Sequence, residues 1–292
     1  MPNHPVHDVN LQAHQVNYPA RKITSPDGKV NVLQITDLHL SMADINADHD
    51  LGCLDNYQHS FQAVLQQALS EDIRCDLIVV TGDLVNEVKP AIYDYIFEVL
   101  HATKIPFVCI AGNHDVTDET GHELPFEQWQ LIAQPADKRL LSRHVIDTKY
   151  WQILLLDSAI PGKIAGKITL SDIDWLCQQL SNCDKPALLA LHHHVLPMNS
   201  NWIDAHIADN TDMFWQRMAA FVQLRVVISG HTHQQQVRYR NGVTVYTTPS
   251  TCYQFKPYED YFAVDKNARP GYRWLQLANN GQVASWVKRL DT

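Results

Sequence analysis

Five separate apolar runs in this chain of 292 residues each end in side chains that bind metal ions. The runs are short and rich in strand-forming residues, and the continuous apolar run over residues 76–80 is typical of a strand buried on both faces. Helical patterns lie between them, and this alternation indicates an α/β protein. The groups that follow the runs are Asp37-Leu38-His39 after residues 30–36, Thr81-Gly82-Asp83 after 76–80, Gly112-Asn113-His114-Asp115 after 106–111, His192-His193-His194 after 187–191, and Gly230-His231-Thr232-His233 after 225–229.

The position of these groups predicts a metal centre. A single Asp or His after a strand is usually a turn or loop residue, but five such groups at the same kind of position favour a shared site. The carboxyl ends of strands form the ligand crevice of α/β sheets, so we expect the groups to converge. Their donors are imidazole, carboxylate and amide oxygen without a thiolate, which suits iron, manganese or zinc. The candidate ligands are too many for one tetrahedral ion and indicate two divalent ions that share a bridging carboxylate.

Composition excludes several classes of protein. Lysine and arginine total 23 against 32 for aspartate and glutamate, a net charge of −9, and no basic stripe exists that would bind nucleic acid. No apolar run is long enough to span a membrane. The first residues lack the pattern of a secretory signal, which predicts a cytoplasmic protein. The six cysteines form no regular framework and are expected to be reduced.

The chain is expected to form a flexible amino-terminal tail over residues 1–29 and a single domain over residues 30–292. His4, His7 and His14 in the tail are interpreted as solvated residues rather than as a metal site. After His233 the pattern changes to two hairpins, because strand-like runs flank the turn dipeptides Asn241-Gly242 and Asn280-Gly281. A long loop over residues 41–56 is a candidate for the rim of a pocket.

The metal-binding groups also carry a resemblance. DLH, GD, GNHD, a histidine after a strand and GHTH, in this order, resemble the calcineurin-like metallophosphoesterase family. The segments LQITDLHL, WQILLLDS, LHHHVLP and TPSTCYQFKP are most similar to the bacterial class III 3′,5′-cyclic AMP phosphodiesterases. The resemblance spans roughly residues 30–292. It implies a four-layer αββα sandwich, in which two mixed β-sheets are flanked by helices.

The resemblance also implies a role for each ligand. One ion would be held by Asp37, His39 and His233, and the second by Asn113, His192 and His231, while Asp83 would bridge both. His192 is preferred in its histidine run because it directly follows the strand. His193 is the alternative, and a packing role is the default for the histidines that do not bind metal.

The implied activity is hydrolysis of 3′,5′-cyclic AMP to 5′-AMP by attack of a metal-bridging hydroxide. Two divalent ions, two carboxylates and one hydroxide give the centre a net charge of about +1, which attracts a phosphodiester. His114 is expected to contact the phosphate and to stabilise charge or protonate the leaving oxygen. Asp115 would orient His114, or would instead be a plain turn residue. The residues expected at the substrate are His39, Asp83, Asn113, His114, His192 and His233.

Substrate specificity is less constrained by the sequence. Trp202, Tyr253 and Phe255 are expected near the site, but a core or interface role is favoured for each, and no residue is assigned to adenine. A related enzyme that acts on glycerophosphodiesters or other nucleotides is an alternative, because relatives share the metal motifs. A scaffold protein on a disabled fold is disfavoured because the ligand positions and His114 are all filled. The oligomeric state stays open.

Overall fold

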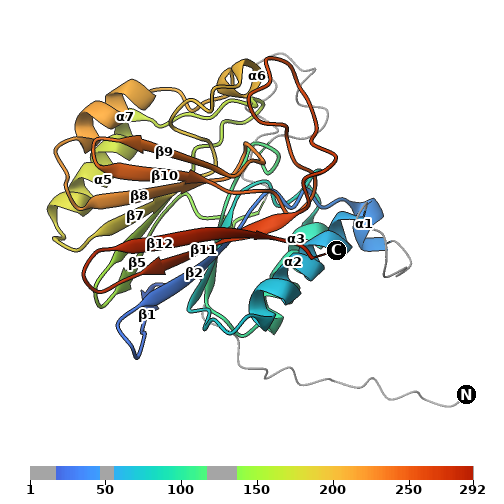
Figure 1. The fold of residues 1–292 in the computed structure, drawn as a ribbon, viewed down its shortest axis with the longest axis horizontal. Helices are drawn as coiled ribbons and strands as arrows, with labels where there is room; N and C mark the ends of the chain where they lie inside the picture. Colours follow the sequence, from blue (N-terminus) through green and yellow to red (C-terminus); the bar gives the residue numbers. More distant parts are fainter. Residues whose placement is uncertain (1–17, 47–55, 117–136, 292) are drawn as a thin grey trace, which may run out of the picture.

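The computed structural model describes residues 18–46, 56–116 and 137–291, which form two facing β-sheets with helices outside them (Figure 1). Both sheets combine parallel and antiparallel pairs. The five-stranded sheet has the order β12 (Val283–Arg289), β11 (Gly271–Leu277), β2 (Val30–Ile35), β3 (Leu77–Thr81) and β4 (Phe107–Ile110). The seven-stranded sheet has the order β1 (Lys22–Ile23), β5 (Arg143–Thr148), β6 (Gln152–Leu156), β7 (Ala187–Ala190), β8 (Leu224–Ser229), β10 (Val243–Thr247) and β9 (Gln236–Arg240).

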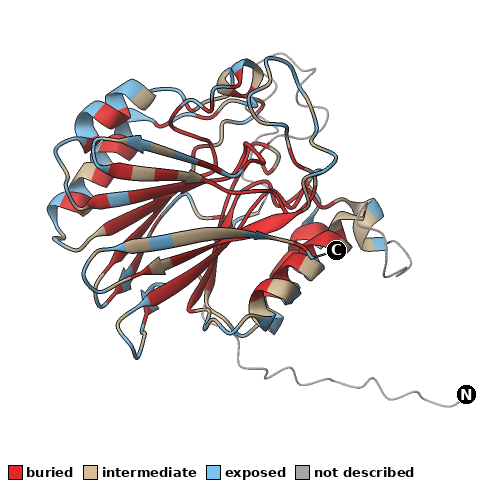
Figure 2. Ribbon diagram, viewed as in Figure 1, coloured by how far each residue is buried: buried red, intermediate tan, exposed pale blue. Residues whose placement is uncertain are grey.

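Three apolar cores separate four layers. The outer core on the five-stranded sheet packs against α2 (Tyr57–Ser70) and α3 (Pro90–Ala102). The outer core on the seven-stranded sheet packs against α5 (Leu170–Ser181) and α7 (Thr211–Met218). The third core lies between the sheets, and Figure 2 shows the buried strands at the centre of the molecule. The predicted four-layer αββα sandwich is therefore confirmed.

The continuous apolar runs follow from this layering. Along β3, Ile78 and Val80 face the helices, whereas Leu77 and Val79 face the opposite sheet. Successive side chains of a strand point to opposite faces, so a strand covered on both sides carries apolar residues at most of its positions. The parallel pairs β2–β3–β4 and β7–β8 then bring the predicted metal-binding groups to one edge of the sandwich.

The two carboxyl-terminal hairpins belong to different sheets. The β9–β10 hairpin extends the seven-stranded sheet, and its turn residues Asn241 and Gly242 both have positive φ, as a two-residue type I′ turn requires. The β11–β12 hairpin extends the five-stranded sheet instead. Strand β10 pairs in parallel with β8, so this part of the chain is less purely antiparallel than its hairpin turns suggest.

The predicted boundary at residue 30 is wrong for residues 18–29. Strand β1 pairs in parallel with β5, and Ala20 and Ile23 are buried in the core between the sheets. The ring of His144 also contacts the carbonyl of Ala20, with 2.6 Å between Nε2 and the oxygen. A strand of two residues is too short to give a periodic sequence signal, which is why the pattern missed it. Residues 1–17, including the tail histidines, lie outside the described residues.

Other predictions concern short or partly described segments. The predicted loop over residues 41–56 begins with a short helix, α1 (Met42–Asn46), and residues 47–55 lie outside the described part. A further short helix, α6 (Asn201–Asp204), follows the histidine run. Five cysteines are free thiols in the structure, and Cys53 lies outside the described residues. Within the described ranges, no helix is both long and apolar enough to cross a bilayer.

Candidate metal centre

The backbone is unusual where the predicted ligands follow their strands. Five of these residues have positive φ, a region that side chains other than glycine rarely occupy. Such conformations gather at functional sites because the surrounding structure must hold them in place. The residues are Asp37 (φ 54°), His39 (φ 50°), Asp83 (φ 51°), His231 (φ 64°) and His233 (φ 48°).

Glycines allow these loops to approach one another closely. Gly82 has a φ of +92°, and a Cβ there would lie 2.4 Å from His192 Nδ1. A Cβ on Gly112 would lie 2.2 Å from an Asp83 carboxylate oxygen. Both distances are shorter than any van der Waals contact. At Gly82 the backbone conformation and the space both require glycine, whereas at Gly112 the space alone does.

All seven predicted ligands lie together and are buried. None has more than 5% of its surface exposed. Among the described residues, groups that include six of them offer ligand atoms within 4.8 Å of one another; the seventh, Asn113, contributes an amide oxygen. The seven are Asp37, His39, Asp83, Asn113, His192, His231 and His233.

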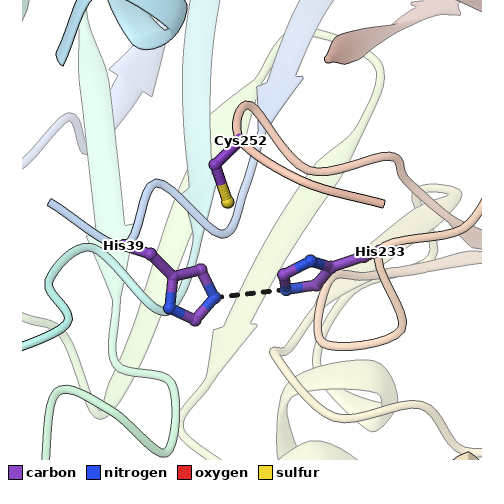
Figure 3. Close-up of side chains that lie close together, drawn as sticks. All are labelled: His39, His233 and Cys252. Carbon is purple, nitrogen blue, oxygen red and sulfur yellow. Dashed lines mark hydrogen bonds between the residues drawn. The ribbon is translucent and has the colours of Figure 1, made fainter. Parts of the chain in front are cut away.

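The first group comprises Asp37, His39 and His233, of which Figure 3 draws His39 and His233. His233 Nδ1 donates to the carbonyl of Tyr253 at 2.9 Å, which leaves a lone pair on Nε2. That Nε2 atom lies 3.2 Å from His39 Nε2 and 3.4 Å from an Asp37 carboxylate oxygen. Figure 3 shows the two imidazoles turned toward each other from separate loops.

The second group comprises Asn113, His192 and His231. His192 Nδ1 donates to the carbonyl of Thr81 at 2.7 Å, so its Nε2 also keeps the lone pair. His192 Nε2 lies 3.2 Å from the Asn113 side-chain oxygen, and His231 Nδ1 lies 3.1 Å from the same oxygen. The Nε2 atom of His231 is buried without a hydrogen-bond partner among the described residues.

Asp83 lies between the two groups. Its Oδ2 atom is 3.6 Å from His39 Nε2 in the first group and 3.4 Å from His192 Nε2 in the second. Its Oδ1 atom accepts a hydrogen bond from the backbone N–H of His114 at 2.9 Å. Burial opposes ionisation of this carboxyl group, but the neighbouring His192 and His114 outweigh it and lower the pKa of Asp83. An ionised carboxylate in this position has the geometry of a bridging ligand.

The arrangement fits cations better than it fits an empty pocket. Lone pairs of His192 and His233 face oxygen or nitrogen acceptors, which repel one another unless a positive charge lies between them. Burial disfavours the charged form of His192, but Asp83 outweighs this effect and raises the pKa of His192 to about 9. A proton on His192 reduces the repulsion between these lone pairs, and a metal ion bound between them would reduce it further. The donors are nitrogen and oxygen atoms, as the sequence predicts for a di-metal site.

Cys252 is a neighbour of the first group that the sequence pattern did not single out. Its sulfur points toward His39 and His233 in Figure 3, and it lies 3.3 Å from the carbonyl of Asp37. Burial raises the pKa of the Cys252 thiol. The contact of its sulfur with the Asp37 carbonyl supports the loop that carries Asp37.

The other members of the histidine run have different surroundings. His193 has both ring nitrogens engaged, because Nδ1 lies 2.9 Å from the hydroxyl of Ser158 and Nε2 lies 3.0 Å from the carbonyl of Ile164. His194 stacks on His231, with 5.7 Å between ring centroids, and its Nε2 lies 3.5 Å from an Asp204 carboxylate oxygen. These contacts leave His193 no ring nitrogen with which to bind an ion.

Of the two roles expected for Asp115, its contacts favour that of a turn residue over that of orienting His114. Its side chain accepts hydrogen bonds from the backbone N–H of Gly112 at 2.8 Å, the backbone N–H of Leu84 at 3.1 Å and the hydroxyl of Tyr93 at 2.8 Å. These contacts use both carboxylate oxygens and leave His114 without an orienting partner in Asp115. Burial and the nearby Asp83 raise the pKa of Asp115 to about 7. Asp115 therefore joins the loop after β3 to the loop after β4.

A cavity of about 510 Å³ opens above the buried ligands. Small-ligand pockets span roughly 300–1,000 Å³, so it has the size of a metabolite site. Five of the six residues expected at the substrate line it, but His192 is fully buried below it. The lining residues are His39, Asp83, Asn113, His114, Ile164, Trp202, Ile203, His206, His231, His233, Tyr253, Phe255 and Phe262.

The cavity changes the interpretation of its aromatic residues. Trp202, Tyr253 and Phe255 line the cavity, so the core or interface role favoured for them is not their only role. Sequence reasoning missed Phe262, Ile164 and His206 entirely. These residues lie on loops without a periodic pattern, and only their aromatic or apolar character could have drawn attention to them. Their side chains form an apolar wall opposite the polar ligands.

A buried polar network lies beneath the centre and joins the two sheets. Gln34 on β2 donates to the hydroxyl of Thr81 at 2.9 Å and to the carbonyl of Ser229 at 3.1 Å. It also accepts from Thr248, whose hydroxyl in turn accepts from the guanidinium of Arg273 at 3.0 Å. These bonds fix the carboxyl ends of strands from both sheets relative to each other, which such a precise centre requires.

Comparison with known proteins agrees with this geometry. Residues 30–235 match the sequence model of the calcineurin-like phosphoesterases. A protein of Psychrobacter arcticus named probable cyclic nucleotide phosphodiesterase is 65% identical over 94% of this chain and 99% of its own length. The 3′,5′-cyclic adenosine monophosphate phosphodiesterase CpdA of Escherichia coli is 34% identical over 90% of this chain and 91% of its own length.

Solved structures share the fold at low sequence identity. A dimetal phosphatase from Danio rerio superposes with a TM-score of 0.56 at 14% identity, over 90% of this chain and 99% of that chain. A likeness of this kind supports the architecture alone, while the sequence matches extend through the strands and loops that carry the buried ligands. The chain is thus a member of the calcineurin-like phosphoesterase family.

Proposed function

We propose that this protein hydrolyses 3′,5′-cyclic AMP to 5′-AMP with two divalent metal ions. Asp37, His39 and His233 would hold one ion, and Asp83 would bridge to the second. Asn113, His192 and His231 would hold that second ion. His192 is proposed rather than His193 because both ring nitrogens of His193 already contact protein groups.

The observation that carries the proposal is the buried convergence of seven residues with nitrogen and oxygen ligand atoms. Folding a protein around such a cluster is costly unless cations compensate it. The names of the relatives support the substrate, because those from Psychrobacter arcticus and Escherichia coli are both named for cyclic nucleotides.

The protein's own residues account for the other requirements of the reaction. The ions would lower the pKa of a water molecule and neutralise charge on the phosphodiester. The water oxygen forms a bond to phosphorus, the bond from phosphorus to the 3′ oxygen breaks, and the 3′ oxygen takes up a proton. His114 lines the cavity with its imidazole, 4.6 Å between ring centroids from His39, and is proposed to donate that proton.

The test is a hydrolysis assay with the purified chain. Protein loaded with manganese or iron is incubated with cyclic AMP, and 5′-AMP is separated and quantified against a control that contains metal alone. We expect 5′-AMP, and a kcat/KM for cyclic AMP above that for glycerophosphodiesters and for other nucleotides. If folded, metal-loaded protein instead has a higher kcat/KM for a glycerophosphodiester, the proposed substrate is wrong and the alternative one is correct.

Two broader expectations belong to this proposal. Residues 18–291 are proposed to form one domain, because three cores connect the four layers, and a single calorimetric unfolding transition is expected.

A cytoplasmic location is supported by the five free thiols, which are typical of a reducing compartment. Fractionation of the source cells would test the location.

A further inference from the structure

Three aromatic side chains of the cavity lining contact one another beside the predicted ligand His233. We call Trp202, Phe255 and Phe262 the aromatic corner. Trp202 packs edge-on against Phe255 and Phe262, with ring centroids 4.8 and 5.3 Å apart. Phe255 in turn stacks on His233, with a centroid distance of 4.4 Å and an angle of 20° between the rings. The aromatic corner therefore lies directly against a proposed metal ligand.

The aromatic corner contains an exposed aromatic ring and a hydrogen-bond donor without a partner. Phe262 is 65% exposed although it lines the cavity, which is a costly position for a phenylalanine without a ligand. The indole N–H of Trp202 is buried without a hydrogen-bond partner among the described residues. Buried donors usually have partners. Trp202 lines the cavity, but its Nε1 atom is covered, so a ligand in the cavity would reach this donor only after the indole turns. An open aromatic ring and an unpaired donor together indicate a planar ligand that carries a hydrogen-bond acceptor.

We propose that the aromatic corner binds the base of the cyclic nucleotide. Phe262 stacks on the base, and the Trp202 indole turns toward the cavity so that Nε1 donates to one of the ring nitrogens of the base. This inference rests on the proposed function, in which the phosphate lies at the metal centre. Bases stack on aromatic side chains, and adenine presents acceptors at N3 and N7.

The unpaired indole N–H distinguishes between two ligands that bind aromatic rings, a nucleotide base and a quaternary ammonium group. A quaternary ammonium group, as in some glycerophosphodiesters, is drawn to aromatic faces by cation–π interaction. Such a group has no lone pair and would leave the N–H of Trp202 unsatisfied. A base satisfies both the ring faces and the donor, so the aromatic corner favours a nucleotide over a choline-type headgroup.

The experiment compares cyclic AMP with a base-free substrate, the 3′,5′-cyclic phosphate of 1-O-methylribose. Phe262→Ala is expected to lower kcat/KM for cyclic AMP relative to the base-free substrate by roughly tenfold, mainly through KM. Trp202→Phe keeps an aromatic ring and removes the donor, and is expected to lower the same ratio by roughly fivefold. Tyr261→Ala is the matched control, since Tyr261 is 85% exposed on the same loop and does not line the cavity.

The outcomes separate this inference from the proposed function. If wild-type protein hydrolyses cyclic AMP and Phe262→Ala keeps the wild-type ratio, the base site is refuted and the proposed function stands. If wild-type protein hydrolyses the base-free diester but not cyclic AMP, both the proposed substrate and the base site fall. A variant loss seen for glycerophosphocholine instead of cyclic AMP would assign the aromatic corner to a cationic headgroup.

Discussion

Two regions of the cavity are built in opposite ways. The metal-binding region consists of strand termini, where every predicted ligand is buried and five hold positive φ. The aromatic corner consists of loop residues and the short helix α6, and Phe262 there is largely exposed. The reaction tolerates little displacement of the metal-binding residues, which suits their fixed positions after strands. The aromatic corner, which is built largely on loops, suits recognition of the rest of the substrate.

The contrast implies that variants in the metal-binding region lose turnover and that variants at the aromatic corner lose substrate affinity. The largest effect is expected for Asp83→Asn, because the amide keeps the size of the side chain but removes the charge between the two ligand groups. We expect the metal content and kcat to fall together, with hydrolysis close to background. Metal analysis and turnover measured on the same sample test this. Asp212→Asn, on the exposed face of α7, is the control.

His114→Ala is expected to have the next largest effect. Loss of a proton donor typically costs roughly 10²–10⁴-fold in rate, so kcat for cyclic AMP should fall within that range. Bis(4-nitrophenyl) phosphate releases a phenolate that needs no proton, and its hydrolysis should suffer much less. Equal losses on both substrates would contradict a donor role and would indicate that His114 supports phosphate binding or the position of Asp83.

The smallest effect is expected at Asp115, where two substitutions should differ. Asp115→Asn preserves an acceptor for Leu84 and Gly112, and the hydroxyl of Tyr93 can accept from the new amide, so kcat/KM should stay near wild type. Asp115→Ala leaves buried donors unpaired and should lower the free energy of unfolding by at least about 2 kcal/mol. Thermal or urea unfolding measures this. A large loss of turnover in Asp115→Asn with normal stability would restore a direct catalytic role.

The difference between the two regions also explains why the sequence predicted the metal-binding residues but not the role of the aromatic ones. The metal-binding groups follow strands buried on both faces, and such strands leave a continuous apolar signal, so convergence at one edge followed from the pattern. Trp202 lies in the four-residue helix α6 and Phe262 in a loop, where side-chain placement depends on tertiary contacts that no sequence period encodes. Strand β1 was missed for the same reason, since Lys22 and Ile23 alone carry no period. The sequence left two roles open for Asp115 because its partners Leu84 and Tyr93 come from other segments of the chain.

The most direct test of the account is anomalous diffraction from crystals grown with manganese. We predict two peaks per chain, one beside Asp37, His39 and His233 and one beside Asn113, His192 and His231, with the Asp83 carboxylate in contact with both. Two sites that share this carboxylate would support the proposed centre. A single peak, or peaks remote from Asp83, in crystals of folded protein would contradict it.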